Sequence, residues 1–148
     1  MEIEKTIEFD QVKLKWSSLA LTKYAKDKIE KIGPFMSEGE LRKNIKDTTE
    51  SKVMIEKCGT PPLVSLEGME KILATAQKGD CLTALQLENV ERTFVAFRRL
   101  KEYLNRGKQL ELSLAYEEEK IELLEDIRQM IALQIRNGAV DDHATKVL

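Results

Sequence analysis

Three arginines of this chain recur at the spacing that aligns side chains along one face of a helix. Arg92, Arg99 and Arg106 follow one another at seven-residue steps, which places them within about 40° around a helix axis and roughly 10 Å apart along it. Guanidinium groups in such a row can contact successive phosphates of a nucleic acid, or an acidic helix such as the one expected to begin at Glu117. The alternative is a solvent-exposed face with salt bridges along the helix.

Other residue types that often perform chemistry lack the partners they need. His143 is the single histidine, and no cysteine or carboxylate cluster lies at ligand spacing from it, so we expect neither a zinc site nor a catalytic triad. The carboxylates at 117–119, 122, 125 and 126 are interpreted as a solvated helix face, because hard cations need oxygens that converge on one point. Cys58 and Cys81 are isolated, and we expect both to be buried thiols. No catalytic residue, cofactor or metal is predicted.

The arginine row requires a long helix, and the residues before it supply a start signal. Thr83 and Gln86 have the spacing of a capping box, so we expect a helix over 84–106, a rod of roughly 35 Å. An apolar row recurs along it at three- and four-residue steps, formed by Leu87, Val90, Phe94, Phe97 and Leu104. Lys101 fills the remaining position, with its ammonium group at the rim. This row lies opposite the arginines and predicts a seam against a partner.

The first half of the chain predicts further helices. Apolar residues at helical spacing favour one bent helix or two short helices over 6–32. A second capping box, Ser37 with Glu40, begins a polar helix that ends at Cys58-Gly59. Thr60-Pro61-Pro62-Leu63 cannot continue a helix, because proline lacks an amide donor. A short helix is expected over 66–77, followed by a turn at Gly79.

The second half is expected to contain one more helix. Asn105-Arg106-Gly107 is interpreted as the stop of the long helix. Leu110 to Leu114 alternate with polar residues, so this segment fits a helix start, a loop or a short strand. A last helix is predicted over 117–136 and is closed by Asn137-Gly138, with glutamates in its first turn where they suit the helix dipole.

Size and composition fit an all-α domain. The chain has 148 residues, of which 34% are charged and only 5% aromatic, a composition typical of helices with solvated outer faces. The net charge of −2 gives no general attraction to nucleic acid or to a membrane surface. No apolar run is long enough to span a bilayer and no signal peptide is recognised, so a cytoplasmic location is expected. The predicted core comprises Trp16, Phe94, Phe97, Leu104, Leu124 and Ile131.

Several short segments, in a fixed order along the chain, carry a family resemblance. They are Thr6-Ile7-Glu8-Phe9-Asp10, Asp47-Thr48-Thr49-Glu50-Ser51, Gly59-Thr60-Pro61-Pro62-Leu63, Ala76-Gln77-Lys78-Gly79, Arg98-Arg99-Leu100-Lys101 with Leu104, and the stretch 136–145. Together they resemble the N-terminal region of the MutS family. The branch is the bacterial one that lacks mismatch-reading domains and usually carries a C-terminal Smr nuclease domain.

The resemblance implies the core, or lever, domain of that family. In complete members this helical connector joins a DNA-gripping clamp to a dimeric ATPase, and those members are implicated in suppressing recombination at branched DNA and in rescuing stalled ribosomes. The chain has no G-x-x-x-x-G-K-S/T phosphate-binding loop, so the clamp, ATPase and Smr parts are expected to lie outside it. Either it is a fragment, or it is a free-standing relative that keeps only the connector.

We therefore predict a single helical domain over 1–148, an irregular bundle of five or six helices that is not itself an enzyme. Its expected role is a non-catalytic connector or interaction module of a MutS-like DNA repair or recombination-control protein. Branched or duplex DNA or the ribosome would be bound through the complete protein, with no membrane partner. The alternative hypothesis is a stand-alone helical adaptor that forms homodimers or docks a helical protein, because 84–106 and 119–136 both carry heptad-like seams.

Overall fold

The computed structural model describes residues 8–33 and 37–141. In this part of the chain the helices are α2 (Phe9–Leu19), α3 (Lys23–Glu30), α4 (Glu38–Cys58), α5 (Met69–Gln77), α6 (Ala84–Lys108), the 3-10 helix η1 (Ser113–Lys120) and α7 (Glu125–Gln134). A small antiparallel hairpin, β1 (Ile135–Arg136) and β2 (Ala139–Val140), follows α7. The all-α, multihelical prediction is confirmed.

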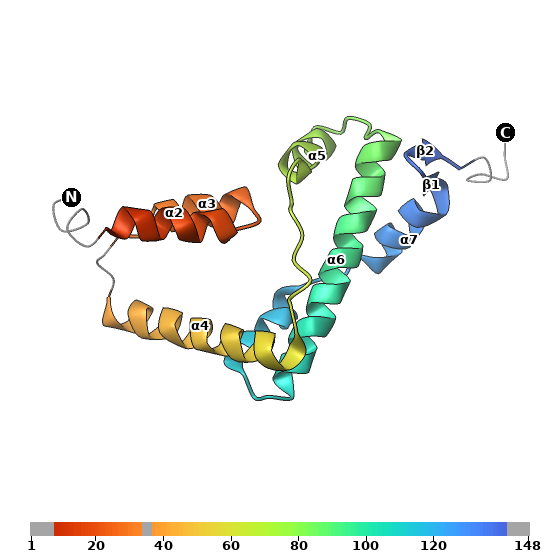
Figure 1. Ribbon diagram of the computed structural model, residues 1–148. Coiled ribbons are helices and arrows are strands. Elements are labelled where there is room, and N and C mark those ends of the chain that lie inside the picture. Colours follow the sequence, from red (N-terminus) through yellow and green to blue (C-terminus); the bar gives the residue numbers. More distant parts are fainter. Residues whose placement is uncertain (1–7, 34–36, 142–148) are drawn as a thin grey trace.

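Helix α6 is the central element of an open arrangement (Figure 1). Helices η1 and α7 lie along it, whereas α4 meets its C-terminal end and extends away from it. Helices α2 and α3 pack on each other and are set apart from α6 (Figure 1). The chain exposes 11784 Å² of surface, whereas a compact monomer of 17.0 kDa exposes about 7,700 Å². The helices are therefore those of an open frame and not of a closed bundle.

The predicted core is only partly correct. Ile131 is buried, and Phe94, Phe97 and Leu104 are half-buried. Trp16 is 48% exposed and Leu124 is 44% exposed, so neither belongs to the core. Trp16 lies on α2, which packs mainly on α3 among the described elements, and Leu124 precedes α7 instead of lying within a helix.

Both predicted capping boxes are present and fix the starts of the two longest helices. Thr83 Oγ1 accepts from the Gln86 amide at 3.2 Å, and Gln86 Oε1 accepts from the Thr83 amide at 2.8 Å. Ser37 and Glu40 make the same reciprocal pair ahead of α4. These local hydrogen bonds satisfy first-turn amides that have no helical partner. The first helical region is two short helices, because Thr22 caps α3 through the Ala25 amide.

The sequence predicts that Gly107 ends helix α6. In the structure Gly107 lies within this helix. The helix continues to Lys108. A Cβ atom added at Gly107 would lie 2.8 Å from Met54 Cε and 3.0 Å from Ala115 Cβ. Glycine at this position therefore permits α4 and η1 to approach the α6 backbone. Met54 is 2% exposed and Ala115 is fully buried, so the closest contact of three elements is centred here.

The predicted helix over 117–136 is wrong, because residues in it bond to other elements. Helix η1 occupies 113–120, the segment 121–124 is non-helical, and only 125–134 is α-helical. The carbonyl oxygen of Ile121 accepts from Lys101 Nζ at 2.8 Å, instead of from the amide four residues later. Asn137-Gly138 does not merely stop a helix; it forms the turn between β1 and β2 with φ of 51° and 72°. Leu110 to Leu114 form a turn and the start of η1, not a strand.

We predict that Gly107→Ala destabilises the fold. Alanine has the higher helix propensity by about 1 kcal/mol, but its methyl group must displace Met54 or Ala115. We expect a net loss of about 1–2 kcal/mol in the free energy of unfolding, measured by urea denaturation. Gly39→Ala is the control, because Gly39 lies in α4 with no atom within 4 Å of its added Cβ. A Gly107→Ala protein at least as stable as the parent would contradict the close contact.

Candidate interaction surface on helix α6

Helix α6 buries a different face from the one that its apolar row predicts. Its most buried residues are Thr93, Ala96, Tyr103 and Gly107, which lie roughly 100° around the helix from the row that contains Phe94 and Phe97. The row itself is half-buried. Helix α6 therefore uses two adjacent faces inside the molecule, and the arginine row borders one of them.

Arg92, Arg99 and Arg106 are all solvent-exposed. Arg92 Nη2 lies 2.6 Å from Glu88 Oε1, one turn earlier in α6. The Arg106 guanidinium lies 5.4 Å from the centroid of the buried Tyr103 ring, a cation–π arrangement. Arg99 makes no ion pair among the described residues. The row therefore keeps its positive charges in solvent, where a partner can reach them.

A hollow of about 300 Å³ lies beside the first arginine, near the start of α6. Its lining consists of Ile72, Leu85, Gln86, Glu88, Asn89 and Arg92. The two ionisable groups of this lining, Glu88 and Arg92, bind each other. The hollow therefore presents no pair of groups arranged for acid–base or nucleophilic chemistry.

The carboxylate of Glu118 joins η1 to α6. Glu118 is only 6% exposed, and it receives a hydrogen bond from Lys108 Nζ, while its Oε2 lies 3.3 Å from Lys101 Nζ. Lys108 also donates to Glu119 Oε1 at 3.1 Å. The Lys108 ammonium is the main cause that lowers the pKa of Glu118, against the opposing effect of burial. Two turns of α6 thus hold one buried carboxylate.

The carboxylate of Glu50 joins α4 to the start of η1. Glu50 is 9% exposed and accepts from the Leu114 amide at 2.6 Å and from Ser113 Oγ at 2.8 Å. The Leu114 amide is the main cause that lowers the pKa of Glu50; burial opposes it and Ser113 assists it. A carboxylate at the N-terminus of a helical segment binds amides that otherwise lack partners. Glu50 of α4 therefore holds the N-terminal end of η1, whereas Glu118, near the C-terminal end of η1, is held by lysines of α6.

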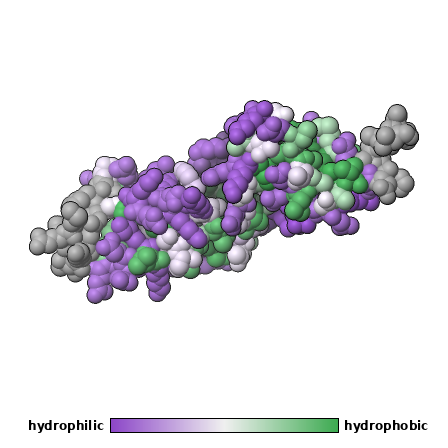
Figure 2. Space-filling model, turned by 90° about the horizontal axis from the view of Figure 1, so that it is seen from above, coloured by the Kyte–Doolittle hydropathy of each residue, from purple (hydrophilic) through white to green (hydrophobic). Residues whose placement is uncertain are grey.

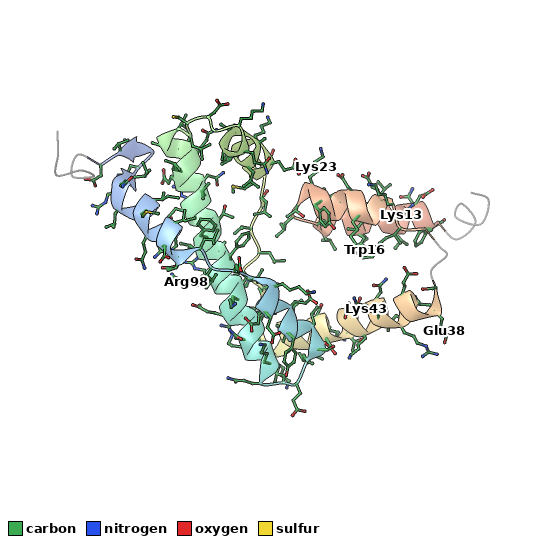
Figure 3. The ribbon with its side chains drawn as sticks, turned by 180° about the vertical axis from the view of Figure 1, so that it is seen from behind. Lys13, Trp16, Lys23, Glu38, Lys43 and Arg98 are labelled. Atoms are coloured by element: carbon green, nitrogen blue, oxygen red, sulfur yellow. The ribbon has the colours of Figure 1, made fainter. Side chains whose placement is uncertain are left out.

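A third group of charges connects α6 to α7. The Arg128 side chain is 17% exposed. Its Nη1 lies 3.2 Å from Glu91 Oε1 in α6, and its Nη2 lies 2.5 Å from Glu125 Oε1 in α7. Arg98 of α6, labelled in Figure 3, places Nη1 4.0 Å from the same Glu125 oxygen. Arg128 is the main cause that lowers the pKa of Glu125. Helix α7 is thus attached by paired charges as well as by Ile131.

The structure corrects several interpretations of single residues. Glu118 and Glu125 are not a solvated face, because lysines and arginines of other elements bind them. Lys101 is not simply at a rim, since its ammonium bonds to Ile121 O and Glu118. Cys81 is exposed and Cys58 is half-buried, so the prediction of two buried thiols is wrong.

His143 lies outside the residues that the structure describes, 8–33 and 37–141. No group of three or more His, Cys, Asp or Glu side chains within these residues is placed to hold a metal ion. None of the described helices has the length and apolar character needed to cross a bilayer.

The chain is similar in sequence to part of longer curated proteins named Endonuclease MutS2. The protein of Clostridium botulinum (strain Kyoto / Type A2) is 32% identical over 124 residues, covering 83% of this chain and 15% of the relative. The protein of Clostridium beijerinckii is 30% identical over 102 residues, covering 69% of this chain and 13% of the relative. No protein-family model and no solved structure matches the chain. The similarity supports a relationship to the MutS family.

We predict that the chain loses stability in acid through Glu50 and Glu118. Both pKa values are lowered from 4.5, so the stabilisation is present above the unfolded-state pKa and is lost as pH falls below about 4.5 through the folded-state value. Glu50→Gln should cost about 1–2 kcal/mol at pH 7 and flatten this dependence, measured by urea denaturation from pH 7 to pH 3. Glu118→Gln should flatten it as well.

Glu56→Gln is the matched control in α4. The Glu56 side chain is 58% exposed, and its Oε1 lies 3.9 Å from Lys52 Nζ, so its removal should leave the pH dependence unchanged. Equal pH profiles for the Glu50→Gln variant and the parent would refute the role of Glu50.

Proposed function

We propose that this chain is a non-catalytic helical connector of a MutS-like DNA repair or recombination-control protein. It would belong to the bacterial branch with a C-terminal Smr domain, and it would supply part of the core, or lever, region. The chain spans about 15% of the length of the relatives that it matches. We infer that the activity for which those relatives are named lies in their other segments.

The observation that carries this proposal is a set of largely buried charges that attaches two elements, η1 and α7, to helix α6, and attaches α4 to η1. Helix α6 has 25 residues, a length of about 38 Å, and Glu118 and Arg128 connect η1 and α7 to it. Glu50 connects α4 to η1. Such a helix keeps its neighbours in fixed positions, because one partner cannot leave without exposing an unpaired buried charge. This is the mechanical property that a connector needs.

The contacts within the chain limit the surfaces that the adaptor hypothesis can use. The two seams over 84–106 and 119–136 were expected to face a partner, but α6 and α7 pack on each other within the chain. Ile131 and the half-buried Phe94 and Phe97 therefore are not free to form a coiled coil with a second protein. Any self-association must use other surfaces.

The connector role predicts that this chain can replace the matching segment of a relative. We expect a chimera of Clostridium botulinum Endonuclease MutS2, in which this chain replaces the similar segment, to keep most of the parent's nuclease activity. Introducing Ala96→Pro into the chimera should abolish that activity, because proline within α6 breaks the helix at a cost of about 3 kcal/mol or more. Circular dichroism would verify that the rest of the chimera is folded.

Assays of the isolated chain provide a second test of the connector role. We expect it to cleave no DNA and hydrolyse no ATP above a buffer blank. Either activity in the purified chain, if abolished by substitutions within it, would contradict the connector role.

We further propose that Arg92, Arg99 and Arg106 give the connector a weak contact to DNA phosphates. The isolated chain should bind duplex, branched and single-stranded DNA with a dissociation constant of about 10⁻⁴–10⁻⁶ M at physiological salt, the range of non-specific contacts, and more tightly at low salt. Reversal of all three arginines to glutamate should weaken this binding at least about tenfold and reduce its salt dependence, as measured by fluorescence anisotropy.

Arg42, Lys52 and Lys57 of α4 provide a control triple reversal with the same change in net charge. All three are exposed. If this control weakens binding as much as the α6 reversal does, net charge and not the row is responsible. Nanomolar binding by the isolated parent chain would instead argue against a mere connector.

A further inference from the structure

The two ends of the molecule carry exposed apolar side chains together with opposite unpaired charges. We propose that the helical hairpin formed by α2 and α3 docks on the α7 end, residues 121–141, of a second copy of this chain. The proposal does not depend on the connector role, since it concerns surfaces that the α6 contacts leave open.

The helical hairpin has a second apolar face beyond the one that holds it together. Ile29 is 7% exposed and lies in the contact between the two helices. Val12, Trp16 and Leu19 repeat at four- and three-residue steps along α2 and are 55%, 48% and 76% exposed. These positions form one stripe on α2. A stripe of this kind is characteristic of a helix that contacts a partner.

The α7 end offers an apolar surface of similar character. Ile131 faces the interior at 9% exposure, whereas Ile127, Met130 and Leu133 on other sides of α7 are 42%, 55% and 70% exposed. The neighbouring Leu85, Leu123, Leu124 and Val140 are also exposed. Seen from above, apolar side chains gather at this end of the molecule (Figure 2).

The charges that accompany these two surfaces are complementary. Residues 8–33 hold six lysines and four carboxylates, and Lys13 is paired with Asp10 at 3.5 Å. Within the described part of the chain the other five lysines make no ion pair, and neither do Glu8, Asp27 and Glu30, so the helical hairpin keeps a net positive charge. At the α7 end, Arg128 and Arg136 are occupied by carboxylates, while Glu122 and Asp126 make no ion pair in the described part of the chain.

The positions of these charges match the apolar stripes. Asp126 precedes Met130 by four residues and Leu133 by seven, so its carboxylate lies on the same side of α7. Lys15 borders the Val12–Leu19 stripe of α2 on the helical wheel. The apolar stripe of α2, bordered by Lys15, can therefore pack on the apolar side chains of α7 while Lys15 approaches the carboxylate of Asp126.

The arrangement of the ends favours a second copy over an intramolecular contact. The helical hairpin lies at the opposite end of the molecule from α7 (Figure 1), and Figure 3 shows its labelled Lys13, Trp16 and Lys23 far from Arg98 on α6. Two antiparallel copies related by a twofold axis would make the contact twice and close the assembly.

Sedimentation equilibrium of the 148-residue chain tests this inference. We expect dimers at micromolar concentration and low salt, with dissociation as salt screens the charges. Leu133→Asp should weaken the dimer at least about tenfold, because it places a charge in the apolar contact. Leu41→Asp is the control, since Leu41 is 48% exposed on α4, outside both surfaces. Circular dichroism would show that both variants are folded.

A charge swap identifies the two surfaces. Lys15→Glu or Asp126→Lys should each weaken the dimer at least about tenfold, and the two changes in one chain should restore it. A monomeric parent across micromolar concentrations at low salt would overturn the proposal, as would a dimer that neither reversal affects. A monomer that instead binds the remaining part of an Endonuclease MutS2 would show that a longer protein covers these faces, and would also overturn it.

Discussion

The paired burial of Glu118 between Lys101 and Lys108 is the interaction on which the rest of this structure depends. A carboxylate removed from water is unfavourable unless cations and hydrogen bonds replace its hydration, and two lysines two turns apart on α6 do so. They hold η1 on α6, which brings Ala115 against Gly107. Met54 and Glu50 then attach α4 to the same place. Apolar packing contributes, but these charges determine which surfaces meet.

The parts of the fold that were predictable from the sequence are those whose causes are local. The boxes at Thr83 and Ser37 specify helix starts within a few residues, and the diproline segment interrupts helical structure wherever it occurs. Gly107 was misassigned because a glycine that ends a helix and a glycine that admits a neighbour look alike in sequence. The Asn137-Gly138 pair is a hairpin signal between Ile135 and Val140, but the apolar residues before it also have the spacing of one continuous helix.

The positions of some surface residues were predictable from the sequence, and those of others were not. The seven-residue spacing of the arginines indicated one exposed face of α6, and the three side chains do lie in solvent. Whether they bind a partner stays a prediction. The buried roles of Glu50 and Glu118 could not be foreseen, because each resembles the many solvated glutamates of this chain. Glu50 differs from them because its hydrogen-bond donors, Ser113 and Leu114, lie 63 and 64 residues away in the sequence. Glu118 differs because two lysines of another helix bind it. Such pairings depend on tertiary contacts.

Within the described part of the chain, the contacts of α4 with α6 and η1 lie near the C-terminal end of α4, which gives that helix the form of a lever arm. Its contacts to α6 and η1 involve Glu50 and Met54 near its C-terminal end, while its first turns extend away from α6 (Figure 1). From Glu50 to Glu38 the helix reaches about 18 Å, so a pivot of about 10° at Gly107 would sweep its tip through roughly 3 Å. Small adjustments at one fulcrum would thus be magnified into a swing of the distal segment.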